Sequence, residues 1–391
     1  MKVFDVAIIG GGIIGSSIAF ELAAEKLEVV LLDREEPGRG ASWAAAGMLS
    51  AAPDSPEARP LVPLAKESLE LYPQFISRIE DATEPFMHFG SEGTLQIFPG
   101  PNAEFDRDKM VADLKTLGIE IEPVTLETAR KMESAISPNI HAVAWLPRES
   151  TVDPRSLMEA ILAALRYRDV EIRAGCSATS ITRQGSTCTG LTAHGEPISA
   201  KIVVLAAGCH SANLAGENIV EDGWLSRYAP TRPIRGQMLA LHSTEIELQR
   251  VLRSERGYLV PRHEGRIVAG STLEDVGFNK NLTAGGIREI LNAAIELAPR
   301  LAHAQLLETW AGLRPGTPDH LPIIGPTHID GLFVATGHYR NGILLAPITA
   351  KLVRDWIVDQ KMPATARIFS PLRFADQNSQ GSASRNTAAN S

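Results

Sequence analysis

The sequence predicts an α/β protein, in which a parallel-sheet domain is interleaved with an α+β domain built mainly on antiparallel strands. Three observations support this prediction. The chain opens with a strand–turn–helix–strand pattern, a near-continuous apolar strand recurs at 201–208, and short strands dominate the stretches 86–146 and 224–307. At 391 residues the chain also exceeds one typical domain.

The opening unit runs from a β-branched strand at 3–9 through Gly10, Gly12 and Gly15 into a helix and then a second strand that ends at Asp33. In such a turn the first glycine permits the bend, the second admits a pyrophosphate and the third lets helix and strand pack closely. An acid roughly 20 residues further on binds ribose hydroxyls. The unit therefore predicts a Rossmann-like dinucleotide site, for NAD or FAD, rather than an ordinary glycine-rich turn.

Composition argues against several classes of function. The net charge of −8 disfavours a nucleic-acid partner, and no apolar run reaches the roughly 18 residues that span a membrane. Cys176, Cys188 and Cys209 form no C-x-x-C pattern, which suits a reducing cytosol. Because His and Cys are not spaced as ligands either, we expect a cytoplasmic protein without a metal site.

The small residues after Asp33 predict a loop with a short helix, capped by Ser42 and running through Ala46. They fit a backbone lying flat on a planar ligand as well as they fit tight helix packing. Apolar periodicity predicts a helix over 64–79, and short strands and helices are predicted after it. These are strands at 86–89, 94–98 and 141–146, and helices near 106–117 and 126–132.

Asp153 followed by Pro154 is a typical helix start, and it predicts a helix to 166. A strand at 170–173 and a hairpin region with turns near 184–185 and 194–195 follow. The apolar strand that ends at Gly208 then fits a central position in the same sheet, with its small residues close to the nucleotide.

The C-terminal part returns to strands and loops. The expected elements are strands at 258–262, 266–271 and 332–337, helices at 282–297 and 342–358, a Pro/Gly-rich turn at 310–319, and a disordered polar tail after 375.

Four blocks together resemble the glycine oxidase branch of the D-amino-acid oxidase family of flavoproteins. They are residues 8–15, 41–49, 310–319 and 337–347. The resemblance implies non-covalent FAD and oxidative deamination of glycine, other small amines or D-amino acids, with hydride passing from the α-carbon to flavin N5. It also implies O2 as acceptor, H2O2 as product, imine supply for the thiazole of thiamine, and a homo-oligomer, typically a tetramer.

The resemblance also implies a division into domains. The FAD-binding domain would comprise 1–83, 147–223 and 308–372, the substrate domain 84–146 and 224–307, and the tail 373–391.

Family motifs assign cofactor contacts to residues along the whole chain. Those implied for the adenosine diphosphate half are Ile13, Ile14, Asp33, Arg34 and, at the adenine, Ala178. Those implied for the pyrophosphate and flavin are Ala41, Ser42, Ala46, Gly47 and Met48. Those implied for the pyrimidine edge of the flavin are His338, Tyr339, Arg340, Asn341, Gly342, Ile343 and Leu344.

An α-amino acid needs a cation for its carboxylate, and Arg314 is the best candidate because a guanidinium binds both oxygens in a planar fork. The resemblance places the Tyr258 hydroxyl beside it and assigns Arg340 to the substrate as well. Two other basic residues of the substrate domain, Arg232 and Arg235, rank lower.

Several alternatives stay open. Arg314 could instead pair with Asp319 and merely fix its loop, and His338 could be a general base, although its motif position favours backbone contacts to flavin. The chain could be a sarcosine or D-proline oxidase, a D-amino-acid dehydrogenase, or a binding module without enzymatic activity. Sarcosine oxidases usually link flavin to a C-terminal cysteine, and no cysteine follows Cys209.

Overall fold

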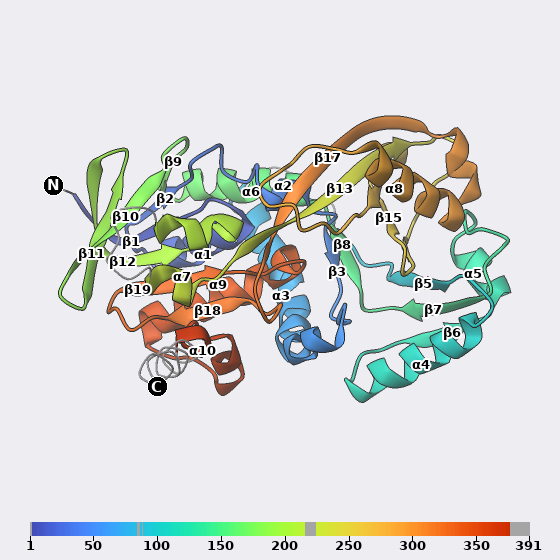
Figure 1. The fold of residues 1–391 in the computed structure, drawn as a ribbon, viewed down its shortest axis with the longest axis horizontal. Helices are drawn as coiled ribbons and strands as arrows, with labels where there is room; N and C mark the ends of the chain where they lie inside the picture. The colour runs from blue at the N-terminus through green and yellow to red at the C-terminus, as the bar shows by residue number, and fades with distance from the viewer. Residues whose placement is uncertain (1, 84–86, 88, 216–223, 376–391) are drawn as a thin grey trace, which may run out of the picture.

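The computed structural model describes residues 2–83, 87, 89–215 and 224–375. Within these residues the strands form two eight-stranded sheets and a three-stranded sheet. The two large sheets lie side by side along the longest axis of the molecule (Figure 1). This confirms the predicted α/β class, whereas the domain boundaries proposed above stay a prediction.

The first sheet has the order β10-β11-β12-β1-β2-β9, with β19 beside β12 and β18 beside β19. Its strands are β1 (Val3–Ile9), β2 (Val29–Leu32), β9 (Glu171–Arg173), β10 (Ala178–Gln184), β11 (Thr187–Ala193), β12 (Glu196–Leu205), β18 (Ile323–Pro326) and β19 (Leu332–Thr336). Strands β9, β2, β1, β12 and β19 are parallel. Val6 and Ile8 pack into one core cluster and Ala7 into another, so both faces of β1 are buried.

A group of helices covers one face of this sheet. It consists of α1 (Ile13–Ala24), α3 (Val62–Glu80), α6 (Pro154–Tyr167) and α9 (Gly342–Asp359). Asp153 caps α6 as predicted, because its Oδ1 accepts the Arg155 N–H at 2.9 Å. Helix α1 packs against both α6 and α9, which brings the first and last helical parts of the chain together.

The second sheet has the order β17-β13-β16-β15-β14-β5-β7-β6. Its strands are β5 (Thr94–Phe98), β6 (Glu122–Val124), β7 (Ala142–Leu146), β13 (Arg232–His242), β14 (Val251–Arg253), β15 (Tyr258–Pro261), β16 (Arg266–Gly270) and β17 (Gln305–Gly316). One face packs on α8 (Ala284–Leu297), through residues such as Leu239 and Leu259. The opposite face turns Met238 and Tyr258 toward Ala44 and Ala46 of the first part of the chain.

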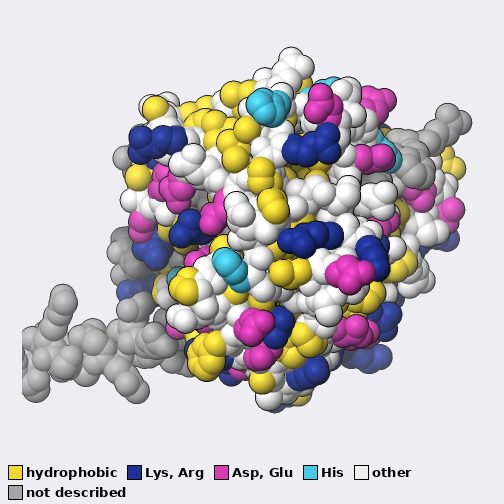
Figure 2. Space-filling model, turned by 90° about the vertical axis from the view of Figure 1, so that its right-hand side faces the viewer, with side chains coloured by type: hydrophobic (Ala, Val, Ile, Leu, Met, Phe, Trp, Pro, Cys, Tyr) yellow, Lys and Arg dark blue, Asp and Glu magenta, His cyan; other side chains and the backbone are white. Residues whose placement is uncertain are grey.

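Shorter elements complete the fold. The small sheet consists of β3 (Met48–Leu49), β4 (Phe89–Gly90) and β8 (Ser150–Val152). The other helices are α2 (Ala41–Ala44), α4 (Ala103–Thr116), α5 (Leu126–Met132), α7 (Trp224–Tyr228) and α10 (Leu372–Ala375), with 3-10 turns that include η1 (Pro56–Leu61) and η2 (Gly208–Ala215). On the face drawn in Figure 2, basic and acidic side chains are interspersed.

The prediction of a turn at 310–319 was wrong, because most of these residues belong to the long strand β17. Its proline, Pro315, lies opposite Pro233 of β13, and β17 is the edge strand of its sheet. An edge strand tolerates proline because the missing N–H faces away from the partner strand.

Other differences are smaller. Helix α2 ends at Ala44 rather than Ala46. Of the strand predicted at 86–89, residues 86 and 88 lie outside the described residues, and residue 89 belongs to β4. The disordered tail predicted after 375 also lies outside the described residues. Among the described helices, none is long and apolar enough to cross a membrane.

Candidate active site

The turn between β1 and α1 requires its glycines. Gly10 has a φ of +107°, and a β-carbon there would lie 2.4 Å from the Ala206 carbonyl oxygen. A β-carbon on Gly15 would lie 1.9 Å from the Gly10 carbonyl oxygen. The first glycine therefore permits the turn, and the last lets α1 approach β1, as the motif predicted.

Ser42 does not cap its own helix, which corrects the prediction. Helix α2 has no side-chain cap at Gly40. Instead, Ser42 Oγ accepts the Ile13 N–H at 2.9 Å, at the first turn of α1. The helix that would bind the pyrophosphate is thus capped by a residue from the neighbouring segment, because its own N-cap, Gly12, has no side chain.

Asp33 lies directly after β2 and orders the turn around it. Its Oδ2 accepts the Gly11 N–H at 2.8 Å and its Oδ1 accepts the Glu35 N–H at 2.9 Å. Burial raises the pKa of this carboxyl above its ordinary value, although the two N–H donors oppose that shift. Each carboxylate oxygen has a further lone pair, so ribose hydroxyls could still bind.

A cavity of about 390 Å³ lies between the two large sheets, within the size range of small-molecule sites. Most of the predicted cofactor residues line it: Gly10, Gly12, Ile13, Ile14, Asp33, Arg34, Ala41, Ser42, Ala46, Gly47, Met48, Ala178, Gly208, His338, Tyr339, Arg340, Gly342 and Ile343. The predicted substrate residues Tyr258 and Arg314 line the same cavity. Segments far apart in sequence therefore converge on one site.

Three predicted cofactor residues do not line this cavity. Gly15 is buried between α1 and β1. Leu344 is buried in the core, and its carbonyl oxygen accepts the Ser68 hydroxyl at 2.6 Å. Asn341 lines a smaller neighbouring cavity of about 140 Å³. Helical geometry explains Leu344, because successive residues of the first turn of α9 point in different directions.

The segment before α9 forms one wall of the cavity. His338 is buried, its Nε2 lies 3.0 Å from Thr349 Oγ1, and burial lowers its pKa to about 3. Gly342 and Ile343, the first residues of α9, line the cavity. A helix N-terminus carries partial positive charge, so this wall favours negative charge on a ligand.

Arg314 is a half-buried cation that faces the cavity. Its Nη2 donates to Ser271 Oγ at 2.7 Å and its Nη1 to the Thr272 carbonyl at 3.2 Å. Within the described residues it forms no ion pair, and burial lowers its pKa below the ordinary value. A guanidinium whose two hydrogen-bond partners are neutral is suited to an anionic ligand in such a place.

The alternative role of Arg314 is contradicted. Asp319 pairs with Arg373, whose Nε lies 2.7 Å from Asp319 Oδ2. The lower-ranked arginines are also engaged: Arg235 pairs with Glu274, and Arg232 pairs with Asp275 at 2.7 Å.

The two other predicted substrate residues, Arg340 and Tyr258, already have partners within the protein. Arg340 Nε lies 3.2 Å from Asp54 Oδ2, and both side chains are about one-third to two-fifths exposed (36% and 40%). The Tyr258 hydroxyl lies 3.2 Å from Met238 Sδ. Arg340 can therefore reach a ligand only by sharing or leaving its carboxylate partner, unlike Arg314.

Several cavity residues were missed by the sequence reasoning. They include Gly236, Met238, Ser271, Cys209, His210 and Lys280. Gly236 and Met238 alternate with Arg235 and Gln237 along β13, so period-two alternation over 232–242 was a usable signal. The sequence held no comparable signal for Lys280, which lies on a loop, or for His210, which lies in the short 3-10 helix η2.

A dinucleotide-type turn shares one cavity with a cation that has no acidic partner among the described residues. This combination defines the class of protein: a nucleotide-dependent enzyme for a small anionic substrate. A family model described as FAD dependent oxidoreductase (DAO) matches residues 5–356, and the chain belongs to this family.

Several relatives match most of the chain. It is 36% identical to the "Bifunctional protein ThiO/ThiG" of Trichormus variabilis, over 96% of this chain and 56% of that protein. It is 32% identical to a glycine oxidase of Pseudomonas putida, over 96% of this chain and 99% of that protein. The chain thus spans about half the length of the bifunctional relatives.

Solved structures agree with the family. The crystal structure of glycine oxidase from Geobacillus kaustophilus superposes with a TM-score of 0.87 at 29% identity, covering 95% of this chain and 98% of that one. The cofactor of the family is FAD, and the residues present fit it. Gly10 lets the β1–α1 turn pack closely against Ala206 while the turn lines the cavity, α1 and α9 begin at the cavity, and Asp33 lies at its wall.

Proposed function

We propose that this chain catalyses FAD-dependent oxidative deamination of glycine and other small amines or D-amino acids. The observation that supports this most is Arg314, a cation with no acidic partner within the described residues, in the cavity that also holds the nucleotide-binding turn. Relatives named glycine oxidase at up to 32% identity support glycine as substrate. By the family resemblance, the imine product would supply the thiazole of thiamine.

FAD, when bound, supplies the hydride acceptor for the α-carbon of the amine. The chain's own residues then have to bind and orient the substrate. Arg314 would grip the carboxylate through both oxygens, and the Tyr258 hydroxyl, with only a weak sulfur acceptor at Met238, would donate to the same group. Arg340 would add a second positive charge at the rim.

This route needs positioning more than it needs a general base, and no base role is proposed for His338. Its imidazole is buried, bonded to Thr349 and lowered in pKa to about 3, so it is a poor proton acceptor at neutral pH. The start of α9 would stabilise negative charge on a neighbouring ligand by about 0.3–1 kcal/mol.

The finer parts of the proposal are the electron acceptor, the assembly and the compartment. We propose O2 as acceptor with H2O2 as product, a homo-oligomer, and a cytosolic location. The acceptor is supported by the relatives named as oxidases, and the compartment by three cysteines that are all unpaired.

Oxygen uptake and peroxide release with glycine test the proposal. An oxidase releases nearly one H2O2 per glycine consumed. Flavin reduction without peroxide would instead identify a dehydrogenase. A panel of sarcosine, D-alanine and D-proline at equal concentration ranks the substrates, and a kcat/KM for any of them well above that for glycine would displace glycine as the substrate.

A further inference from the structure

The loop between β16 and α8, residues 271–283, connects the second sheet to the wall of the cavity. We call it the strap. Two of its residues, Ser271 and Lys280, line the cavity, although they lie nine positions apart (280 − 271). Ser271 contacts Arg314, whereas Lys280 shares its part of the wall with Arg34 and His210. The strap therefore contacts Arg314, the proposed substrate residue, and also lines the part of the cavity next to Arg34, where the nucleotide is expected.

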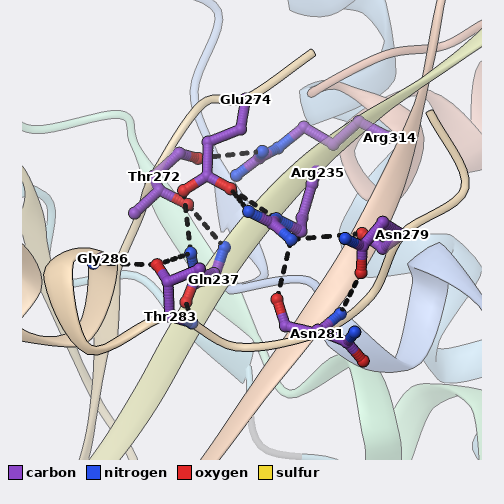
Figure 3. A network of polar contacts seen from close by, with 9 residues as sticks. All are labelled: Arg235, Gln237, Thr272, Glu274, Asn279, Asn281, Thr283, Gly286 and Arg314. Carbon is purple, nitrogen blue, oxygen red and sulfur yellow. Dashed lines mark hydrogen bonds and ion pairs between the residues drawn. The ribbon is translucent and has the colours of Figure 1, made fainter. Parts of the chain in front are cut away.

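Polar contacts from β13 hold the strap at both ends (Figure 3). Arg235, which is 5% exposed, pairs with Glu274 and donates to the Asn281 carbonyl at 2.7 Å. Gln237 donates to Glu274 Oε1 at 2.8 Å and to Thr283 Oγ1 at 3.0 Å. Arg232 of β13 also pairs with Asp275, and Arg235 donates to the Asn279 carbonyl at 3.4 Å, so β13 holds the strap along its length. The exposed residues 276–278 and 280 form the part that projects from this fixed base.

The projecting part reaches the first sheet. The ring of Phe278 stacks on His210, with centroids 4.6 Å apart and an interplanar angle of 18°. His210 follows β12 in η2, and its Nδ1 lies 3.2 Å from Arg34 Nη1. Burial and the neighbouring cations lower the pKa of His210 to about 4, so the neutral ring accepts from Arg34. Arg34 and His210 both line the cavity, so the Phe278 ring packs against one of its lining residues next to Arg34.

Lys280 contributes a positive charge on this side of the cavity. Within the described residues it forms no ion pair, and it lines the cavity on the side of Arg34. A phosphate-bearing ligand in this place would meet an ammonium group with free donors.

We infer that the strap retains the nucleotide half of FAD, with Lys280 binding its phosphates and Phe278 holding His210 in place at the cavity wall. The inference concerns cofactor binding, so it does not depend on which amine the enzyme oxidises.

The test is FAD binding to the cofactor-free protein, followed by flavin fluorescence, in Lys280→Gln and Phe278→Ala. The matched controls are Lys361→Gln, at an exposed lysine after α9, and Phe105→Ala, at a 70% exposed phenylalanine of α4. We expect Lys280→Gln to raise the FAD dissociation constant roughly three- to tenfold, the loss of one partly exposed charge-assisted contact. We expect Phe278→Ala to accelerate FAD release by a similar factor.

A competition experiment with ADP and adenosine separates the contribution of the phosphate charge from that of the adenosine group. ADP and adenosine are each used to displace FAD from the wild type and from Lys280→Gln. The inference predicts weaker ADP binding to the variant and unchanged adenosine binding. Equal weakening of both competitors would overturn the phosphate role of Lys280. If Lys280→Gln and Phe278→Ala bind and release FAD like the control variants, the inference that the strap retains FAD is wrong.

Discussion

Arg314 of β17 lies across Gly236 of β13, and its guanidinium fills the place where a side chain at 236 would begin. A β-carbon on Gly236 would lie 2.1 Å from Arg314 Nη1 and 2.4 Å from Cζ. The two residues are diagonal neighbours on one face, because Arg314 pairs with Ile234 and Gly236 with Gly312. Together with the bonds to Ser271 and Thr272, this contact fixes the cation before any substrate arrives.

Replacing Gly236 by alanine should therefore displace the guanidinium. Any overlap of about 1 Å forces a shift, and misplacement on that scale can cost roughly 100-fold in rate. We expect a KM for glycine raised at least about tenfold in Gly236→Ala, with FAD affinity kept. Gly285→Ala in α8 is the matched control, because nothing lies within 4 Å of its β-carbon position. Unchanged steady-state kinetics in Gly236→Ala would contradict the positioning role.

The planar fork of Arg314 should matter beyond its charge. Arg314→Lys keeps a cation but loses bidentate binding, and hydrogen bonds to charged groups contribute about 1.5–3 kcal/mol. We expect KM for glycine to rise roughly 10- to 150-fold. Arg232→Lys, at an exposed ion pair with Asp275, should leave KM unchanged. Similar KM values in both variants would remove Arg314 from the carboxylate site.

Ser42 should couple the stability of α1 to cofactor binding. Ser42→Ala removes the acceptor for the Ile13 N–H, and loss of such a cap costs about 1 kcal/mol. Thr125→Ala removes a comparable cap from α5, where Thr125 Oγ1 accepts the Thr128 N–H at 3.1 Å. Denaturant unfolding should show similar losses for both. A weaker FAD affinity is expected for Ser42→Ala alone, and equal affinity in the two variants would disprove the coupling.

His338 should make the protein sensitive to acid. Its folded pKa, about 3, lies below the unfolded value of 6.5, so the unfolded state binds a proton first as pH falls. The contribution of the neutral His338 to the free energy of unfolding is fully present above pH 6.5. It is lost as pH falls toward 3, by about 1.4 kcal/mol per pH unit. Urea unfolding at about pH 5 should show an acid loss about 2 kcal/mol smaller in His338→Gln than in wild type. Parallel pH profiles would refute this.

The same variant tests the absence of a base role. We expect kcat of His338→Gln to stay within a few-fold of wild type at neutral pH. A fall of roughly 10²–10⁴-fold, the scale of general-base catalysis, would mean that the imidazole takes the α-proton.

Sequence reasoning located the elements whose signals are local. The β1–α1–β2 unit follows from apolar periodicity and from its glycines, of which sterics require Gly10 and Gly15. The start of α6 follows from Asp153, which caps it. Arg314 was found through its chemistry, since a substrate carboxylate needs a cation.

Prediction from the sequence failed where the conformation or the role of a residue depends on a partner that is distant in sequence. Pro315 and its neighbours look like a turn until β13 is seen to pair with them at a sheet edge. Ser42 has the composition of a cap, but its partner is Ile13, 29 residues away. Likewise, the need for glycine at 236 arises from a guanidinium on another strand. Lys280 reaches the cavity on a loop and His210 on the short 3-10 helix η2, and apolar periodicity predicts the path of neither segment.

Anaerobic addition of glycine to the FAD-loaded protein, followed by flavin absorbance, tests the central claim most directly. The account predicts a yellow protein whose visible flavin band is lost completely with glycine, and at a higher glycine concentration in Arg314→Lys. A protein that binds no flavin, or a flavin band that glycine leaves unchanged, would contradict the account.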